Sequence, residues 1–513
     1  MGATKSEARP AAIGNGKRTA RRSRGPGTIP ELIFGDLWEY DPAPETADPK
    51  IRDQYELYIG GKFVAPKSGK YFDSINPATE KVVARIALAN AEDVDAAYQA
   101  ARKAYDSVWR KMSGKERGKY IYRIARLLQD RAREFAVAET IDGGKPIKES
   151  RDFDVPMAAA HFFYHAGWAD KIEYAIPGVE VESLGVVGQV IPWNFPLLML
   201  AWKVAPALTM GNTVVLKPAE TTSVTAMKFA ELLNEADLPP GVVNFVTGAG
   251  ETGAAVMGHP LAAKVAFTGS TAVGKRIMRQ VAGSDKKMTM ELGGKAANIV
   301  FDDSPIDQAV EGVINGIFFN QGHVCCAGSR LLVQESIYEP FIAKLRNRID
   351  VLRVGNPLDK NTDIGAINSR AQLDRITELV ESGTAGGATM YQSPACRLPG
   401  NGFWFKPTVF TGVTQSHRIA QEEIFGPVLS VLTFRTLEEA VEKANNTAYG
   451  LSAGVWTDKG SRILKMSTEL KAGVVWANTF NKFDPSSPFG GYKESGFGRE
   501  GGRQGLLDYA KIV

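Results

Sequence analysis

The chain has 513 residues, 44% of them hydrophobic and 23% charged, which excludes a small single-core module and a wholly disordered protein. Its formal net charge is +4, but residues 1–30 hold seven basic side chains against one acidic, so the remaining residues carry −2. A basic surface for nucleic acid is therefore not expected on the folded part. Three cysteines, two of them adjacent, are too few for a disulfide framework and indicate a reducing compartment.

No segment of the chain favours export or a membrane span. The basic stretch near the start is not followed by the apolar run that a secretory signal requires. The segment from Ser183 to Trp202 carries no charge over 20 residues, but it contains Pro192, Asn194 and Pro196. It is therefore interpreted as a buried strand that runs into a helix. We expect a cytoplasmic protein without a membrane partner.

Order is expected to begin well after the start of the chain. Residues 1–30 are rich in Gly, Ala, Pro and Arg without helical periodicity, which predicts a disordered leader. The alternating run 55–59, followed by the glycine pair 60–61, predicts a β-hairpin. Residues 113–116 read Ser-Gly-Lys-Glu, the spacing of a capping box, and predict the start of a helix.

From about residue 184, short runs rich in β-branched residues alternate with amphipathic or Ala-rich segments. This alternation predicts parallel sheets covered by helices on both faces, with a nucleotide cofactor at the carboxyl ends of the strands. The predicted strands are 186–191, 213–216, 242–246, 265–268, 298–301, 330–333, 428–433 and 473–476, and the predicted helices include 223–236 and 274–282. The fold class is therefore α/β, with two doubly wound parallel-sheet domains.

Two glycine motifs follow predicted strands. Gly248, Gly250 and Gly253 match the pattern G-x-G-x-x-G, although the acidic residue about 20 positions further on is missing. The run 269–274 lies between a predicted strand and a predicted helix, where main-chain N–H groups can approach a phosphate. Each motif alone predicts a tight turn as readily as a phosphate site. Together with the run Lys-Pro-Ala-Glu at 217–220, they favour a site for a ribose and a pyrophosphate.

Cys325 is the candidate for thiol chemistry. It follows Gly322 and His323 in the polar loop 320–330, a setting in which a thiolate can be reached and activated. The alternative is a buried, unreactive cysteine, since free Cys is among the most buried residue types. The residues around Cys325 leave both interpretations open.

Seven motifs in a fixed order resemble the aldehyde dehydrogenase superfamily over about residues 53–510. They are I-P-W-N-F-P (191–196), K-P-A-E (217–220), F-T-G-S-T (267–271), M-E-L-G-G-K (290–295), the loop around Cys325 (320–330), E-E-I-F-G-P (422–427) and S-P-F-G-G-Y-K (487–493). The resemblance implies a Rossmann-like cofactor domain, a catalytic domain and a small β oligomerisation element. The implied division is a leader with an N-terminal extension (1–50), an NAD-binding domain (51–164 and 184–293), a catalytic thiol domain (294–495) and a bridging element (165–183 and 496–513).

The resemblance also implies a reaction and its catalytic residues. Cys325 falls on the position of the nucleophile, whose thiolate attacks the aldehyde carbon and gives a thiohemiacetal. Asn194 falls on the amide that stabilises the resulting oxyanion. After hydride transfer leaves a thioester, Glu291 falls on the base that activates water, and burial would raise the pKa of its carboxyl. Because CoA-acylating members typically lack this glutamate, a free carboxylic acid is the expected product.

The implied cofactor is NAD. Lys217 and Glu220 resemble the pair that holds the adenine ribose, and Glu423 and Phe425 resemble residues at the nicotinamide ribose and ring. Because Glu220 would face the 2′ position and repel a phosphate there, NADP is less favoured. The implied cofactor-binding residues are Ile191, Pro192, Trp193, Lys217, Glu220, Gly250, Phe267, Gly269, Ser270, Leu292, Glu423 and Phe425. No metal is expected.

The family's substrate tunnel implies an apolar aldehyde tail. Its positions fall on Phe195, Met199, Trp202, Phe483 and Phe489, although ordinary core packing is the alternative for each of these side chains. The nearby Asn481 and Lys482 would instead favour a polar or anionic substrate.

Two residues near the implied site remain open to alternatives. Glu500 matches a family glutamate thought to relay protons, or it pairs with Arg499 or Arg503. His323 stands where the family usually has Gln, and it would add a titratable group near the thiolate. We therefore expect an extra inflection in the activity near neutral pH.

The assembly implied by the resemblance is a homodimer, with a homotetramer as the alternative, because the last strand after Tyr509 is short while the partner strands, about 165–183, are present. Besides the leading hypothesis of an NAD-dependent aldehyde dehydrogenase, two others remain. One is a CoA-acylating oxidoreductase, and the other is a non-catalytic scaffold or nucleic-acid binder that uses the basic leader.

Overall fold

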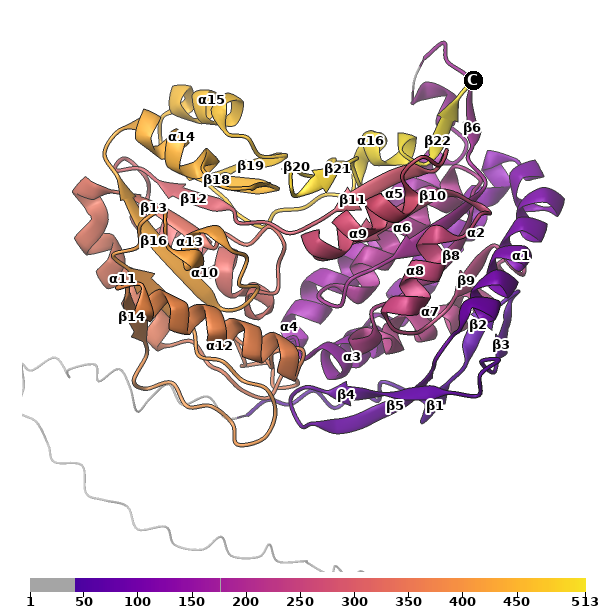
Figure 1. Ribbon diagram of the computed structural model, residues 1–513, viewed down its shortest axis with the longest axis horizontal. Helices are drawn as coiled ribbons and strands as arrows, with labels where there is room; N and C mark the ends of the chain where they lie inside the picture. The colour runs from indigo at the N-terminus through magenta and orange to yellow at the C-terminus, as the bar shows by residue number, and fades with distance from the viewer. Residues whose placement is uncertain (1–41, 176) are drawn as a thin grey trace, which may run out of the picture. The chain divides into compact units, whose positions relative to one another are not determined.

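Two β-sheets covered by helices carry the chain in a computed structural model, which describes residues 42–175 and 177–513 (Figure 1). Parallel strands joined by helical crossovers dominate both sheets, so the predicted α/β fold class is confirmed. The expectation of a disordered leader over residues 1–30 lies outside the described residues.

The first sheet has eight strands in the order β21-β11-β10-β7-β8-β9-β2-β3. Its five middle strands are parallel, and β2, β3 and β21 are antiparallel to their neighbours. Among the parallel strands, the chain starts at β7, adds β8 and β9 on one side and then returns to add β10 and β11 on the other, so the order reverses between β7 and β10. The strands are β2 (Leu57–Ile59), β3 (Lys62–Val64), β7 (Val186–Val190), β8 (Thr213–Lys217), β9 (Val243–Phe245), β10 (Ala262–Thr268), β11 (Lys287–Glu291) and β21 (Gly496–Phe497).

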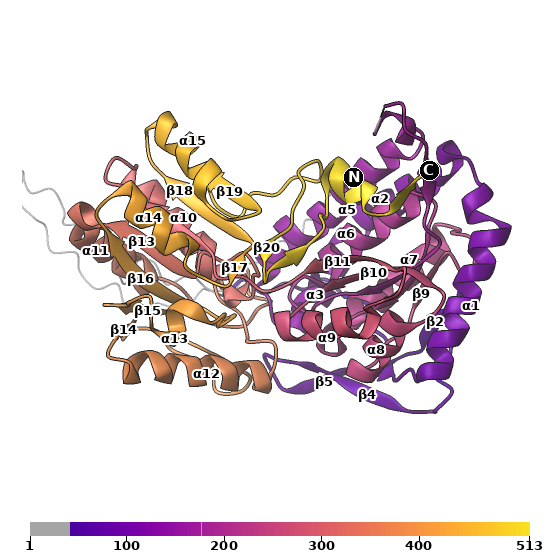
Figure 2. The same cartoon turned by 45° about the horizontal axis from the view of Figure 1, so that its top comes forward.

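Helices cover both faces of this sheet (Figure 2). One group packs around α6, and the other group, with α1, α8 and α9, packs on the opposite side. The first group is α2 (Gly114–Asp130), α3 (Ala132–Gly143), α4 (Ile147–Glu149), α5 (Val155–Trp168), α6 (Pro196–Thr209) and α7 (Val224–Glu235), and the second is α1 (Ala91–Ser107), α8 (Gly250–Gly258) and α9 (Thr271–Val281). Every residue of α6 is buried, which explains why this helix is apolar all round except for Lys203 and Thr209.

The second sheet has seven strands in the order β14-β15-β16-β13-β12-β18-β19, all parallel except β14. Its strands are β12 (Ala297–Val300), β13 (Arg330–Gln334), β14 (Thr389–Gln392), β15 (Thr408–Thr411), β16 (Val428–Phe434), β18 (Ser452–Trp456) and β19 (Val474–Ala477). Its helices are α10 (Ile306–Phe318), α11 (Tyr338–Asp350), α12 (Arg370–Ala385), α13 (Arg418–Gln421), α14 (Leu437–Asn445) and α15 (Gly460–Glu469). The predicted strand at 298–301 thus belongs here and begins this second sheet.

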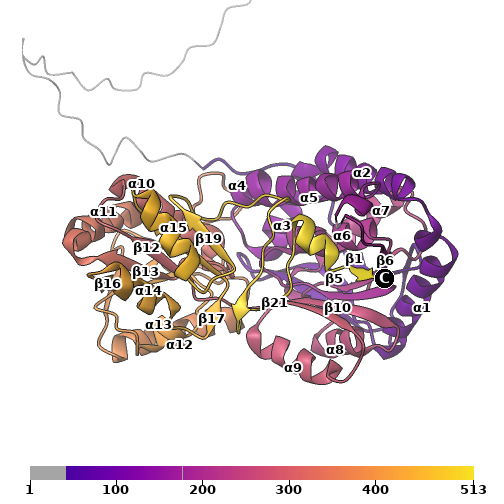
Figure 3. The same ribbon diagram turned by 90° about the horizontal axis from the view of Figure 1, so that it is seen from above.

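Three small sheets and the C-terminal segment complete the described chain. The last segment, drawn in yellow, returns from the second sheet to the first (Figure 3). There β21 pairs with β11. The small sheets contain β1 (Gln54–Tyr55), β5 (Lys81–Ala87) and β4 (Tyr71–Asn76), then β17 (Tyr449–Gly450) with β20 (Tyr492–Lys493), and β6 (Val181–Ser183) with β22 (Ala510–Ile512); α16 (Gly502–Leu507) precedes β22.

The predicted strands over 165–183 are largely wrong. Helix α5 continues to Trp168 and a 3₁₀ turn covers Ile172–Tyr174, so only Val181–Ser183 forms a strand. The apolar face of α5 packs against α6, and this packing extends the helix beyond the point where strands were expected. The implied division of the chain into a leader, an NAD-binding domain, a catalytic domain and a bridging element stays a prediction.

Local sequence signals fix several boundaries. The run 55–59 and its glycine pair form the predicted hairpin of β2 and β3, with Gly61 at φ +80°. Ser113 caps α2, because its hydroxyl accepts the Glu116 N–H at 3.2 Å, but the Glu116 carboxylate pairs with Lys119 at 2.8 Å instead of returning to the cap. Over the described residues, no helix has both the length and the apolar content that crossing a bilayer needs.

Candidate active site

A cavity of about 270 Å³ lies where the two sheets come together. Its walls come from the segments that follow β7 and β10 in the first sheet and from the loops that precede β13 and β16 in the second. The first sheet therefore contributes carboxyl ends of strands at its reversal point, as predicted. The second sheet contributes the loops at the amino ends of β13 and β16 and also the segment after β19, which carries Asn481 and Phe483.

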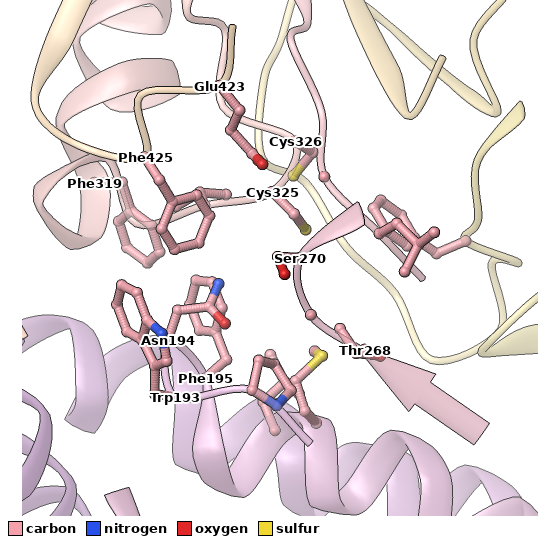
Figure 4. A pocket seen from close by; sticks show the side chains of 18 of the residues that line it. Trp193, Asn194, Phe195, Thr268, Ser270, Phe319, Cys325, Cys326, Glu423 and Phe425 are labelled. Carbon is pink, nitrogen blue, oxygen red and sulfur yellow. The ribbon is translucent and has the colours of Figure 1, made fainter. Parts of the chain in front are cut away.

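Cys325 reaches this cavity from a tightly turned loop after α10. Asn320 and Gln321 adopt positive φ values of 48° and 54°, and Gly322 follows at 75°. A Cβ on Gly322 would lie 2.0 Å from the Gly426 carbonyl oxygen, so only glycine fits this approach. The turn delivers a half-buried Cys325 to the cavity wall, and Figure 4 shows its sulfur pointing into the open space.

The resting state of Cys325 is the protonated thiol. The neighbouring Cys326 thiol and burial both raise the pKa of Cys325 well above its usual range. Cys326 itself is buried, with its sulfur 3.8 Å from the Asn481 side-chain oxygen. Attack by Cys325 therefore requires that its proton be removed.

Asn194 lies opposite the thiol, between β7 and α6. Its side-chain nitrogen donates a hydrogen bond to the main-chain oxygen of His323 at 2.8 Å. In return, the Asn320 side-chain nitrogen donates to the main-chain oxygen of Asn194, also at 2.8 Å. These two bonds connect the segment after β7 to the loop that carries Cys325, and they fix the Asn194 amide at the cavity wall.

Glu291 ends β11 but does not line the cavity. A Cβ placed on Gly490 would lie 2.8 Å from one Glu291 carboxylate oxygen, so the carboxyl rests beside the 490 loop, and neither oxygen has a hydrogen-bond partner. Burial raises the pKa of Glu291 well above its usual range, and the charge of Glu500 raises it further. This direction agrees with the raised pKa expected for a buried Glu291.

Glu500 pairs with Lys203, a residue that sequence reasoning missed. The Lys203 ammonium donates to the Glu500 carboxylate, and both side chains are fully buried. The alternative that Glu500 pairs with Arg499 or Arg503 is therefore wrong. Lys203 is the first charged residue after the uncharged run from Ser183, and a lone lysine in an apolar helix is a signal for a buried ion pair.

A second group of predicted residues lies at the carboxyl ends of β8, β9 and β10. The Lys217 ammonium is 3.3 Å from the Glu220 carboxylate, and burial lowers the pKa of Lys217. Glu220 keeps 53% of its side chain exposed. Ser270 caps α9 and accepts the Val273 N–H at 3.4 Å, while Gly250 opens α8, where an added Cβ would meet no atom within 4 Å. Two helix N-termini therefore face the same edge of the sheet.

Glu423 and Phe425 approach from the second sheet. The Glu423 carboxylate accepts the Gly294 N–H at 3.0 Å, and burial raises its pKa to about 7. Phe425 adopts a φ of 55° and meets the Trp193 ring edge-on, with ring centroids 5.2 Å apart. Figure 4 shows both side chains beside the Cys325 loop.

Aromatic rings form the inner end of the cavity. Trp202 lies 5.4 Å from Phe489 and 6.1 Å from Phe483 between ring centroids. Phe153 and Phe319 complete the wall, with centroids 5.4 Å apart in an edge-on contact. These two were missed because neither lies in a motif of the resemblance.

His323 does not act as a titratable group near neutral pH. Burial and the charge of Lys145 lower its pKa to about 3. Its ring meets Trp193 edge-on at 4.8 Å and stacks on Phe425 at 5.8 Å. The structure therefore contradicts the expectation that His323 adds a titratable group near neutral pH, because the lowered pKa keeps this buried ring neutral there.

The structure brings most of the predicted site residues together. Those that line the cavity are Pro192, Trp193, Asn194, Phe195, Met199, Trp202, Gly269, Ser270, Leu292, Cys325, Glu423, Phe425, Phe483 and Phe489. Those that lie outside its lining are Ile191, Lys217, Glu220, Gly250, Phe267 and Glu291. Lining residues absent from the prediction include Phe153, Leu198, Thr268, Phe319, Gln372 and Arg375.

Comparisons with known proteins agree with this architecture. The model of the aldehyde dehydrogenase family matches residues 63–513. The chain is 44% identical to putative aldehyde dehydrogenase DhaS of Bacillus subtilis, over 89% of this chain and 94% of that protein. It is also 44% identical to human retinal dehydrogenase 2, over 90% and 92% of the two chains.

Solved structures share the fold as well. The NAD⁺ complex of an aldehyde dehydrogenase from Bacillus cereus superposes with a TM-score of 0.89, at 42% identity over 92% of this chain and 99% of that chain. A P. syringae indole-3-acetaldehyde dehydrogenase in complex with NAD⁺ and IAA gives 0.87 at 40% identity, over 90% and 96%. The resemblance seen in the seven motifs is thus confirmed, and the chain belongs to the aldehyde dehydrogenase family.

Proposed function

We propose that this enzyme oxidises an aldehyde to a carboxylic acid, with Cys325 as the nucleophile and NAD as the hydride acceptor. The observation that carries the proposal is the meeting of the Cys325 thiol and the Asn194 amide in one cavity at the reversal point of the first sheet. Aldehyde dehydrogenase chemistry needs a thiol and an oxyanion donor in this proximity.

The residues present fit NAD. The open space at Gly250, the capped N-terminus of α9 at Ser270 and the exposed carboxylate of Glu220 provide for a pyrophosphate and a ribose at one edge of the sheet. Glu423 is held toward the cavity by Gly294, where it would accept hydroxyls of a second ribose. Two relatives of known structure are NAD⁺ complexes. When bound, NAD accepts the hydride that leaves the substrate carbon.

Cys325 and Asn194 perform the first half of the reaction. The Cys325 thiol gives its proton to water and its sulfur bonds to the aldehyde carbon, which converts the carbonyl oxygen to an oxyanion. The second N–H of the Asn194 amide, left free by the bond to His323, donates to this oxyanion together with the Cys325 main-chain N–H. Loss of hydride then leaves an acyl thioester on Cys325.

Glu291 performs the second half. Its carboxylate takes a proton from water as the water oxygen attacks the thioester, which releases the carboxylic acid and restores the Cys325 thiol. Because both oxygens lack partners, the side chain is free to swing from the 490 loop toward the cavity. The buried pair of Lys203 and Glu500 lies within electrostatic reach of Glu291 and would accept or return its proton.

The same glutamate favours hydrolysis over transfer to CoA. A carboxylic acid product needs a base for water, and Glu291 supplies one with a raised pKa. Among the nucleotides, the exposed Glu220 carboxylate beside Lys217 favours NAD, since a 2′-phosphate would be repelled there.

Assembly, compartment and domain boundaries also enter the proposal. We propose a cytoplasmic homodimer, with a tetramer as the alternative. We also propose that each subunit divides into an NAD-binding domain (51–164 and 184–293), a catalytic domain (294–495) and a bridging element (165–183 and 496–513). Ile512 on β22 is 65% exposed, which suits a strand that contacts another subunit. Light scattering at several concentrations tests the dimer.

A panel of aldehydes tests the reaction. Purified protein is mixed with linear, branched and aromatic aldehydes and either NAD or NADP, and formation of NADH or NADPH is followed with and without CoA. We expect reduction of NAD without CoA, and no reduction by Cys325→Ser. An absence of reduction across the panel, or a strict need for CoA, would contradict the proposal.

A further inference from the structure

A buried histidine stands directly behind the substrate cavity. His161 lies on α5, is 1% exposed and does not line the cavity. The indole N–H of Trp202 donates a hydrogen bond to its Nε2 atom. The two rings meet edge-on, with centroids 5.3 Å apart and an angle of 79°. None of the seven family motifs contains His161.

The hydrogen bonds fix the tautomer of this histidine. An indole N–H can only donate, so His161 Nε2 carries no proton and the ring proton sits on Nδ1, which has no hydrogen-bond partner among the described residues. One turn further on, His165 Nδ1 lies 2.8 Å from the His161 carbonyl oxygen, which can only accept, so His165 is protonated at Nδ1. Burial lowers the pKa of both histidines below the usual range. The lowered pKa keeps His161 a neutral hydrogen-bond acceptor near neutral pH.

The hydrogen bond to His161 Nε2 sets the orientation of the Trp202 ring, which forms part of the cavity wall. Trp202 lines the cavity and contacts Phe489 and Phe483 there. Because its only polar atom is bonded to His161 on the far side, the part of the indole that faces the cavity is carbon. A polar edge of the indole, turned inward, would instead present a donor to the substrate tail.

We propose that His161 is a positioning residue for substrate selection, which holds the Trp202 N–H away from the cavity so that the inner wall accepts an apolar aldehyde tail. The inference rests on the proposed aldehyde oxidation and adds the residue that keeps this wall of the cavity apolar. His161 acts through Trp202 and does not itself touch the substrate.

Removal of the acceptor has a directional effect. In His161→Leu the indole N–H is buried without a partner, which is unfavourable enough that the ring turns its N–H toward the wet cavity. An apolar tail then meets a polar group, so its KM rises. In His161→Gln the side-chain oxygen accepts the same hydrogen bond, so the orientation is kept.

Steady-state kinetics with two aldehydes measure this change in KM. For His161→Leu we expect the KM of hexanal to rise about tenfold, the size expected for one lost buried hydrogen bond, relative to the KM of acetaldehyde. Acetaldehyde has only a methyl group to place, so its KM changes little, and kcat stays similar for both. His161→Gln is expected to restore the parent ratio. Equal changes for the two aldehydes, or a Gln variant that behaves like the Leu variant, would overturn the inference.

His165→Leu is the matched control. His165 is buried on the same helix and stacks 6.1 Å from His161, but it has no contact with Trp202 among the described interactions. Its replacement removes a comparable buried ring, so it reports any general loss of packing. The KM ratio of hexanal to acetaldehyde is expected to stay at the parent value. A change as large as that of His161→Leu would mean that packing alone sets the ratio.

A spectrum separates this inference from the proposed function. The indole N–H resonance of Trp202, assigned by its loss in Trp202→Phe, is expected to move upfield in His161→Leu and to return in His161→Gln. Parent protein that reduces no NAD with either aldehyde would contradict the proposed function. An indole resonance that does not move in His161→Leu would contradict the inference.

A double variant covers the case of an insoluble His161→Leu. Trp202→Phe has no indole N–H, so the acceptor is no longer needed in that background. We expect Trp202→Phe with His161→Leu to fold and to show the same KM ratio as Trp202→Phe alone. A further change in the ratio would contradict the role given to His161.

Discussion

The side-chain nitrogen of Asn194 lies 2.8 Å from the main-chain oxygen of His323, two residues before Cys325. This bond joins the end of β7 in the first sheet to the thiol loop of the second. One amide hydrogen of Asn194 makes this bond to His323, and the other remains available to an oxyanion. In the proposed reaction, Asn194 therefore both links the two segments of the site and donates to the oxyanion.

Replacement of Asn194 tests the second of these roles. Asn194→Ala removes the donor, and kcat/KM is expected to fall by about 10²–10³. The replacement also removes the hydrogen bond that links Asn194 to the Cys325 loop, so a control is needed. Asn320→Ala serves as this control, because it breaks the reciprocal bond to the Asn194 carbonyl and leaves the Asn194 side-chain amide in place. A fall in kcat/KM of equal size in both variants would show that only the link between the two segments matters.

Glu291 gives a pH dependence to hydrolysis of the acyl-enzyme. The carboxylate is the active form, and burial raises its pKa, so the rate is expected to be low at acidic pH and to rise with pH through that raised value. Single-turnover release of acid from pre-acylated enzyme isolates this step, because Cys325 is then blocked. Glu291→Gln should lose the pH dependence together with most of the rate, and a retained rise with pH would assign it to another group.

His323 should leave the pH profile near neutrality unchanged. Its pKa of about 3 keeps the ring neutral there, so its charge cannot change in that range. The profile of kcat/KM for His323→Gln is expected to have the shape of the parent profile. An inflection near neutral pH that only the parent shows would contradict the burial of this ring.

The buried pair of Lys203 and Glu500 predicts a strong asymmetry between single and double variants. Lys203→Met leaves the Glu500 carboxylate buried and unpaired, and the free energy of unfolding is expected to fall by about 3–5 kcal/mol. Lys203→Met with Glu500→Leu removes both charges and should recover most of this loss. Denaturant unfolding measures both variants, and a double variant as unstable as the single one would argue against a desolvated ion pair.

Glu220 predicts the choice of nucleotide. Its carboxylate is half-exposed beside Lys217, so Glu220→Ser removes a negative charge and leaves a buried lysine to attract a 2′-phosphate. The ratio of kcat/KM for NADP to that for NAD is expected to rise about tenfold. An unchanged ratio would place the 2′ position elsewhere.

The sequence predicts the scaffold better than the contacts across it. The strand from Val186 and the helix after Pro196 are predictable to within a few residues, because β-branched runs and buried helices leave local patterns. The continuation of α5 to Trp168 is not predictable in this way, since its packing against α6 has no local signature. Tertiary contacts override local preference there.

The same limit applies to the site. Motifs locate Cys325 and Asn194, which lie in distinctive short runs. They do not reveal that Glu291 turns away from the cavity, that Lys203 pairs with Glu500, or that His161 accepts from Trp202. Each of these depends on residues far apart in the chain, and the burial that neutralises His323 is likewise invisible before the fold is known.

The central claim, that Cys325 carries the acyl group after hydride transfer, is tested most directly in Glu291→Gln. This variant is mixed with aldehyde and NAD, and both the burst of NADH and the mass of the peptide that contains Cys325 are measured. We predict one NADH per active site and an added acyl mass on Cys325. The absence of a burst, or acylation of another residue such as Cys326, would contradict the account.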